Sequence, residues 1–176
     1  DGFIFHDESY IEELCRKYKK EINLPFAVMG IIPSYLTQEK LDSLVKAGKV
    51  RALGASAMYG YQFHNLQLAA EKNGWTKFVS MQNHYNLLYR EDEREQIPVC
   101  RQQQVALTPY SPLAAGRLSR LDWHADTKRS QTDKTAVSKY DSMEETDFAI
   151  VQRVHELAQK HGATMTQIAL AWLLAK

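Results

Sequence analysis

The stretch Val105-Ala-Leu-Thr-Pro-Tyr-Ser-Pro-Leu-Ala-Ala-Gly-Arg-Leu118 joins a short apolar strand to a loop that contains prolines and small residues. The strand is predicted over residues 105–107, and Tyr110 and Ser111 follow at its carboxyl end. A nucleotide cofactor needs a surface for stacking and donors for its pyrophosphate. This stretch offers an aromatic ring, a hydroxyl, loop amides and the cation of Arg117, which suit such a ligand. An ordinary exit from strand to loop is the alternative interpretation, because the stretch is not a glycine-rich fingerprint.

Strands and helices alternate along the chain around this stretch. Apolar runs predict strands over residues 2–5, 24–29, 50–56, 78–84 and 105–107, and helical spacing predicts helices over 10–22, 38–47, 60–72, 91–103, 144–161 and 166–174. Residues 119–142 are polar and aperiodic, which predicts a long loop. Alternation with short connections indicates βαβ units. We therefore predict a single α/β domain over residues 1–176 with a parallel sheet, either a partial TIM barrel (half-barrel) or an open flavodoxin-like sheet.

Functional side chains in a parallel sheet lie beyond the carboxyl ends of the strands. The residues predicted there are His6, Asp7, Gly30, Ser56, Gln82, Asn83, Tyr110 and Ser111. Uncharged polar groups dominate the last three strand ends. Such a set is typical of a site that orients a ligand rather than one that exchanges protons.

The composition of the chain argues against several classes of function. The chain has 176 residues with 22 basic and 21 acidic side chains, a net charge of +1, and no apolar run long enough to span a bilayer. These features argue against nucleic acid and membranes as partners. The two cysteines, Cys15 and Cys100, form no metal or disulfide pattern, so we predict no metal site, no iron–sulfur cluster and a cytoplasmic location.

Four stretches in the same order resemble the carboxyl-terminal half of an aldo-keto reductase, from about residue 41 to 176. They are Leu44-Val-Lys-Ala-Gly-Lys-Val-Arg-Ala-Leu-Gly-Ala-Ser56, Gln82-Asn-His-Tyr-Asn-Leu-Leu-Tyr-Arg90, Pro109-Tyr-Ser-Pro-Leu113 and Gln167-Ile-Ala-Leu-Ala-Trp-Leu-Leu174. The resemblance implies a (β/α)8 barrel that reduces aldehydes and ketones with NADPH.

The resemblance also implies roles for single residues. Ser56 and Gln82 are expected to hold the nicotinamide carboxamide, with Asn83 beside them, and Tyr110 is expected to stack on the nicotinamide ring. The residues expected along the pyrophosphate are Ser111, Leu113, Gly116 and Leu118. Many members of the family carry Asn after the Ser, but this chain carries Ala57, which puts one carboxamide contact in doubt.

Residues 1–48 resemble a βαβα segment of a radical-SAM barrel. The resemblance rests on Gly2-Phe-Ile-Phe-His-Asp7 and on Ile32-Pro-Ser-Tyr-Leu, followed by a helix that ends in Ala47-Gly48. The three-cysteine motif of that family is absent, so its radical chemistry is not expected. The two resemblances overlap at Leu44–Gly48, which predicts a chimera or a fragment that crosses over there.

The catalytic apparatus of the aldo-keto reductases is a Tyr acid with Lys, Asp and His neighbours. In that family the Asp, Tyr and Lys come from the first three barrel strands, which have no counterpart in this chain, and His6 is the candidate for the His. We therefore expect weak NADP(H) affinity and weak or no reduction of small carbonyl substrates by the chain alone.

Two alternatives remain open. One is a recombined or designed TIM-barrel-derived scaffold without enzymatic function. The other is a subunit that completes a reductase barrel with a partner chain or as a homodimer, because five βα units cannot close an eight-stranded barrel.

Overall fold

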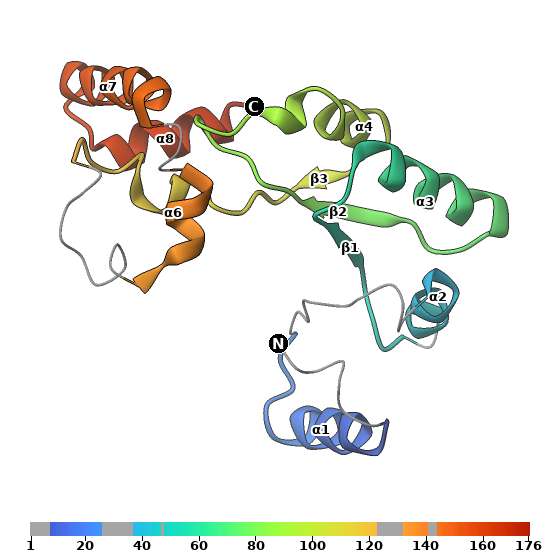
Figure 1. Cartoon of the computed structure of the whole chain (residues 1–176). Coiled ribbons are helices and arrows are strands. Elements are labelled where there is room, and N and C mark those ends of the chain that lie inside the picture. The colour runs from blue at the N-terminus through green and yellow to red at the C-terminus, as the bar shows by residue number, and fades with distance from the viewer. Residues whose placement is uncertain (1–7, 26–36, 47, 123–131, 141–143) are drawn as a thin grey trace. The chain divides into compact units, whose positions relative to one another are not determined.

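The computed structural model describes residues 8–25, 37–46, 48–122, 132–140 and 144–176 (Figure 1). It divides into two compact units, the first comprising residues 1–52 with 69–77 and the second residues 53–68 with 78–176. The predicted strand over residues 2–5, most of that over 24–29, and His6 lie outside the described residues.

The first unit contains helices α1 (Glu8–Glu21) and α2 (Gln38–Lys46), both of which the sequence predicts. Asp42 of α2 is buried and accepts hydrogen bonds from the backbone nitrogen and the hydroxyl of Thr76, each at 2.7 Å. Lys46 pairs with the same carboxylate at 2.7 Å. These donors, first Lys46 and then Thr76, lower the pKa of Asp42, so the carboxylate stays charged and ties α2 to the segment around Thr76.

The second unit contains a parallel three-stranded sheet in the order β1 (Leu53–Ser56), β2 (Phe78–Gln82), β3 (Ala106–Leu107). This arrangement confirms the predicted α/β fold with a parallel sheet. Strand pairing continues past the last ladder, because His84 and Tyr110 form an isolated parallel bridge. The strands are shorter than the predicted ranges, and the pairing of β1 with β2 shifts register between Leu53 and Gly54.

Helix α3 (Gly60–Asn73) packs against β2 through two buried side chains of the helix. Phe63 is fully buried, and its ring centroid lies 6.2 Å from that of Phe78 in β2. The buried amide of Gln67 accepts from the Phe78 nitrogen and donates to the Phe78 oxygen, both at 2.9 Å. Helix and strand are therefore joined by an apolar contact and by a paired hydrogen bond that leaves no backbone group of Phe78 unsatisfied.

The helix predicted over residues 91–103 is wrong as a single element. It consists of the 3-10 helix η2 (Glu91–Glu93) and, after a break, α4 (Gln96–Gln102). Pro98 has no N–H to donate, so it is accommodated in the first turn of a new helix and not in the middle of a longer one. Cys100 of α4 is fully buried with a free thiol, and its burial raises the pKa.

The core of the second unit lies farther along the chain. Helix α7 (Glu144–His161) packs on α8 (Met165–Leu174), and α6 (Lys134–Tyr140) contacts the 3-10 helix η3 (Ala114–Gly116) (Figure 1). The buried cluster between them comprises Ala114, Leu118, Tyr140, Val151, Val154, Ala158, Met165 and Ala169. The prediction of a loop over all of residues 119–142 is therefore wrong at α6, which buries only Ala136 and Tyr140 and so gives too short a pattern to detect.

The predicted ranges of the last two helices, α7 and α8, are confirmed to within one residue. Gly162 ends α7 in the left-handed conformation with φ of 60°, and the Ala163 nitrogen donates to the Ala158 oxygen at 2.9 Å. Thr164 then begins α8 with a reciprocal cap, in which its hydroxyl accepts from the Gln167 backbone and Gln167 accepts from the Thr164 nitrogen. No described helix is long and apolar enough to cross a membrane.

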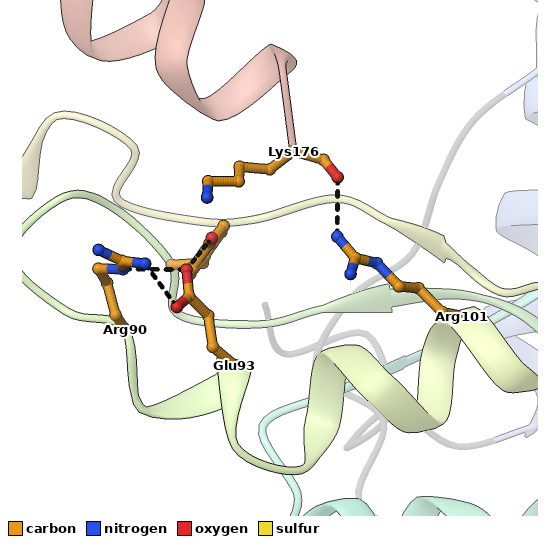
Figure 2. A network of polar contacts seen from close by, with 5 residues as sticks. Arg90, Glu93, Arg101 and Lys176 are labelled. Atoms are coloured by element: carbon orange, nitrogen blue, oxygen red, sulfur yellow. Dashed lines mark hydrogen bonds and ion pairs between the residues drawn. The ribbon is translucent and has the colours of Figure 1, made fainter.

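The carboxyl-terminal residue Lys176 lies near η2 and α4. Figure 2 shows Arg90 forming two hydrogen bonds to Glu93, at 2.9 and 2.7 Å, and Arg101 donating to the Lys176 carbonyl at 3.0 Å. The Tyr85 hydroxyl also donates to Glu93. The Tyr85 ring lies 5.3 Å from that of Trp172, so polar and aromatic contacts together hold α8 beside η2.

Candidate functional site

The carboxyl ends of the three strands are joined by hydrogen bonds. The Ser56 hydroxyl donates to the Gln82 carbonyl at 2.9 Å, which connects the end of β1 to the end of β2. The Tyr110 nitrogen donates to the Asn83 carbonyl at 2.8 Å, which connects the segment after β3 to β2. The structure thus brings the predicted residues Ser56, Gln82 and Tyr110 to one edge of the sheet.

Two residues that follow strand ends adopt the left-handed conformation. Ala57 has φ of 51° and Ser111 has φ of 54°, values that non-glycine residues rarely adopt. The turn at Ser111 directs its carbonyl to the side-chain amide of Asn86, which donates at 2.9 Å. Backbone strain of this kind is held by the surrounding structure and clusters at functional sites.

The ring of Tyr110 belongs to an aromatic stack centred on His84. The imidazole stacks on Tyr89 with centroids 4.1 Å apart and on Tyr110 with centroids 4.9 Å apart, at interplanar angles of 17° and 11°. Tyr140 of α6 contacts the same imidazole edge-on at 5.8 Å. The stack fixes the plane of the Tyr110 ring, which is a requirement for a surface on which a planar ligand lies.

Polar contacts hold this stack in place. The Tyr140 hydroxyl lies 2.6 Å from Nε2 of His84 and accepts a hydrogen bond from the Asn86 amide at 3.2 Å. Because Asn86 donates to the tyrosine oxygen, the tyrosine proton is free to be donated to Nε2, which leaves the imidazole proton on Nδ1. Tyr140 and Asn86 are both buried, so the network is shielded from water.

Burial also sets the charge of these groups. Desolvation, followed by the nearby charge of Lys139, lowers the pKa of His84 from 6.5 to about 4. Desolvation raises the pKa of Tyr140, and hydrogen bonds from Asn86 and Ser111 only partly offset it. At neutral pH the imidazole is therefore uncharged and the tyrosine is protonated.

Asn83 differs from its neighbours in having an unsatisfied side chain. It is 3% exposed, and neither atom of its amide has a hydrogen-bond partner among the residues that the structure describes. Burial raises the pKa of the neighbouring Asp92, and the Asn83 side chain offsets part of that rise. No hydrogen bond of normal geometry joins the two side chains. A buried amide with unused donors and an unused acceptor retains the capacity to bind a polar ligand.

The loop after Tyr110 uses most of its amides internally. The nitrogens of Ala114, Gly116, Arg117 and Leu118 all donate to carbonyls within residues 111–118. Within the described chain, the Ser111 and Leu113 nitrogens donate to no backbone carbonyl. Leu113 and Gly116 are half-buried, whereas Leu118 is fully buried in the core, so its side chain serves packing.

A metal site has no support in the described residues. No group of three or more His, Cys, Asp or Glu side chains within them is placed to hold an ion. His6, the candidate catalytic residue, lies outside the described residues, so its role stays a prediction.

Sequence reasoning missed four residues of this site, namely Asn86, Tyr89, Lys139 and Tyr140. The first two fall in the stretch Gln82–Arg90, which carries the family resemblance, and the closely spaced polar and aromatic side chains there are the signal that was available. Lys139 and Tyr140 gave no local signal, because their importance arises from contacts with residues far away in the sequence.

These observations define a class of protein: a parallel α/β fold with polar groups gathered at the carboxyl ends of its strands. The comparison with family models identifies it more closely, since the model described as the aldo/keto reductase family matches residues 9–176. The chain belongs to this family, and its parallel sheet is consistent with part of the family's TIM barrel.

Curated relatives agree with this assignment. The chain is similar to an aldo-keto reductase of Fusarium vanettenii, with 47% identity over 142 residues, or 81% of this chain and 38% of that protein. It is similar to an aldo-keto reductase of Alternaria alternata, with 49% identity over 143 residues, or 81% and 38% of the two chains. It is also similar to the versiconal hemiacetal acetate reductase of Aspergillus parasiticus, with 46% identity over 136 residues, or 77% and 40%. The chain spans about two-fifths of the length of these relatives.

The assignment corrects the interpretation of residues 1–48. The family match begins at residue 9 and so spans α2 and all but the first residue of α1, the region that resembles a radical-SAM barrel. Nothing in the comparisons supports a radical-SAM segment or a chimera. An apolar strand followed by an amphipathic helix recurs in every (β/α) barrel, so this pattern does not distinguish one barrel family from another.

Proposed function

We propose that this chain forms the nicotinamide side of an NADP(H) site in a carbonyl-reducing oxidoreductase. In this proposal Ser56 and Gln82 bind the carboxamide of the nicotinamide, and the ring of Tyr110 supports the nicotinamide from one face. When bound, the cofactor supplies a hydride for the reduction of an aldehyde or ketone. Membership of the aldo/keto reductase family supports the reaction class.

The observation that carries the proposal is the rigid placement of Tyr110. Its backbone is bonded to Asn83, and its ring stacks on a neutral imidazole at 4.9 Å that Tyr140 and Asn86 hold in turn. A flat aromatic surface with a fixed plane reduces the entropy that a planar ligand loses on binding. Polar groups of two neighbouring strand ends lie at the same edge, which gives a ligand both a surface and an orientation.

Unsatisfied polar groups support the fit of the cofactor to this edge. The amide of Asn83 is buried without a partner in the described residues, so we propose that it contributes to carboxamide binding. The nitrogens of Ser111 and Leu113 donate to no backbone carbonyl of the described chain and are available for a phosphate, whereas those of Gly116 and Leu118 are used inside the loop. We therefore assign the pyrophosphate chiefly to Ser111 and Leu113, with Gly116 allowing close approach.

Catalysis is expected to be weak or absent in the chain alone. We propose that the Asp, Tyr and Lys on which the resemblance bases proton transfer are not supplied by these 176 residues, with His6 as the candidate for the remaining position. Proton transfer by a positioned acid contributes about 100- to 10,000-fold to such reactions. We accordingly propose cofactor binding without efficient turnover, with small carbonyl compounds as the substrate class.

Titration of the purified chain with NADPH, followed by intrinsic fluorescence and energy transfer to the nicotinamide, tests the proposal. We expect saturable binding that is lost in Tyr110→Ala and Gln82→Ala and kept in Tyr61→Ala, which removes an exposed tyrosine of α3. An absence of binding up to about 1 mM, equivalent to about 4 kcal/mol of affinity, contradicts the proposal and favours a scaffold without enzymatic function.

A second proposal concerns the exposed face of the sheet. Val79 of β2 is 52% exposed, whereas its neighbour Phe78 is buried against α3. An apolar strand residue open to solvent favours a partner that covers this face, so we propose a homodimer that completes a barrel. Analytical ultracentrifugation distinguishes the outcomes, because a discrete dimer that Val79→Lys dissociates supports the proposal and a monomer contradicts it.

A further inference from the structure

Lys139, the penultimate residue of α6, lies beside the proposed nicotinamide surface. Its ammonium nitrogen is 5.0 Å from the centroid of the Tyr110 ring. Lys139 is exposed and forms no ion pair with a carboxylate of the described residues. A cation over an aromatic face, with no acidic partner there, is available to an anion that approaches the same ring.

The position of Lys139 is determined by the next residue in the chain. Tyr140 is 3% exposed and belongs to the buried core cluster of the second unit. Its hydroxyl lies 2.6 Å from Nε2 of His84 and 3.2 Å from the Asn86 amide nitrogen. The end of α6 is therefore fixed to the strand-end network, and the Lys139 backbone is fixed with it.

Other cations lie around the same loop. The guanidinium of Arg117 is 5.5 Å from the centroid of the Tyr140 ring, and Arg117 is 9% exposed. A terminal nitrogen of Arg120 lies beside Gly116, 2.9 Å from the place that a Cβ atom would occupy. Lys139, Arg117 and Arg120 thus place basic side chains around a loop whose Ser111 and Leu113 nitrogens donate to no backbone carbonyl of the described chain, a combination that suits a phosphate.

We infer that Lys139 is a cofactor-binding residue whose ammonium group contacts a phosphate of the nicotinamide nucleotide, and that Tyr140 and His84 are positioning residues that hold it there. The inference rests on the proposed function and adds to it a residue from outside the stretches that carry the family resemblance. Of the two phosphate groups that NADPH offers, the diphosphate lies nearer to the nicotinamide end, so we assign the contact to the diphosphate.

Binding of NADPH by Lys139→Met tests the contact directly, with Lys134→Met as the matched control at the exposed opposite end of α6. We expect Lys139→Met to raise the Kd about 10- to 150-fold, as for the loss of a charge-assisted hydrogen bond, and Lys134→Met to leave it unchanged. Loss of a contact between charges makes binding less sensitive to salt. The slope of log Kd against log salt concentration should therefore decrease in Lys139→Met and stay the same in Lys134→Met.

Comparison of NADPH with NADH separates the two phosphate groups. An equal loss of affinity for both cofactors in Lys139→Met assigns the contact to the diphosphate, which the two share. A loss confined to NADPH supports the phosphate contact but moves it to the 2′-phosphate.

A double-mutant cycle tests the positioning role. Tyr140→Phe keeps the ring and removes the hydroxyl that bonds to His84, and it should weaken NADPH binding by misplacing Lys139. In the background of Lys139→Met the same change should weaken binding less, because only its support of the Tyr110 ring through His84 remains. Losses of affinity that simply add would show that Tyr140 affects binding independently of Lys139, which overturns the positioning role.

The possible failures are distinguishable. Saturable NADPH binding by the unsubstituted chain that Lys139→Met leaves unchanged overturns this inference while the proposed function stands. No saturable binding by the unsubstituted chain overturns both.

Discussion

The hydroxyl of Tyr140 lies 2.6 Å from Nε2 of His84, although 56 positions separate the two residues in the sequence. This contact joins α6 to the segment that follows β2. It also places a buried hydroxyl and an uncharged imidazole directly behind the ring of Tyr110. The geometry of the candidate cofactor site therefore depends on residues that are remote from it in the chain.

The pH dependence of stability should report on His84. Its pKa is lowered in the folded chain from 6.5 to about 4, so between these values the unfolded chain binds more protons than the folded one. Stability therefore rises with pH across this window, is fully present above pH 6.5 and is lost as the pH falls, by up to about 3 kcal/mol. Urea denaturation at pH 7.5, 6 and 5 should show the loss in the unsubstituted chain and a smaller loss in His84→Phe.

A matched histidine provides the control for that experiment. His64→Phe changes a histidine of α3 outside the stack and should keep the slope of the unsubstituted chain. Equal slopes for His84→Phe and the unsubstituted chain would show that His84 does not cause the pH dependence.

Replacement of Ala57 should improve both stability and cofactor binding. Ala57 has φ of 51°, a conformation that Asn and Gly adopt with less strain, so Ala57→Asn should raise the free energy of unfolding by about 0.5–1 kcal/mol. Many members of the family carry Asn after the Ser, where its amide is expected to contact the carboxamide. Ala57→Gly relieves the same strain without an amide, so tighter NADPH binding in Ala57→Asn alone identifies the added contact.

The paired hydrogen bond between Gln67 and Phe78 should be worth more than its exposed counterparts. Gln67→Leu keeps the approximate size of the side chain but leaves a buried N–H and a buried carbonyl of Phe78 without partners. The free energy of unfolding should fall by about 2–4 kcal/mol, measured by urea denaturation. Asn65→Leu on the exposed side of α3 should change it by no more than about 0.5 kcal/mol, and a similar loss in both variants would contradict this account.

The contacts around Glu93 should depend on its charge. Hydrogen bonds from Arg90 and then Tyr85 lower the pKa of Glu93, so the stability that this carboxylate contributes is present above pH 4.5 and is lost as the pH falls through the lower folded value. Because Arg90 is 48% exposed, solvent screening limits the effect of Glu93→Gln at pH 7 to about 1 kcal/mol. Thermal unfolding should show this difference at pH 7 and not at pH 3, whereas Glu91→Gln, at a more exposed ion pair, should show none.

Helices with long apolar stripes could be predicted from the sequence. Val151, Val154 and Ala158 recur at helical spacing and are buried, and Gly162 ends the helix at the expected position. Their burial pattern is local, so periodicity alone contains the information.

Elements with few buried residues could not be predicted. Helix α6 buries two residues four positions apart, which no window can distinguish from chance. The candidate site was predicted where side chains follow strand ends, as at Ser56, Gln82 and Tyr110, because parallel strands present those ends at one edge. Lys139 and Tyr140 reach this edge through tertiary packing, which a single sequence does not specify.

Because Cys100 is completely buried, the reactivity of its thiol reports local unfolding in the second unit. A thiol reagent modifies this side chain only during transient openings, and its raised pKa slows the reaction further. In a Cys15→Ser background, the rate of thiol labelling therefore measures the free energy of local opening around α4 without denaturant or an added probe. Slower labelling in the presence of NADPH would then detect ligand binding even where fluorescence does not change.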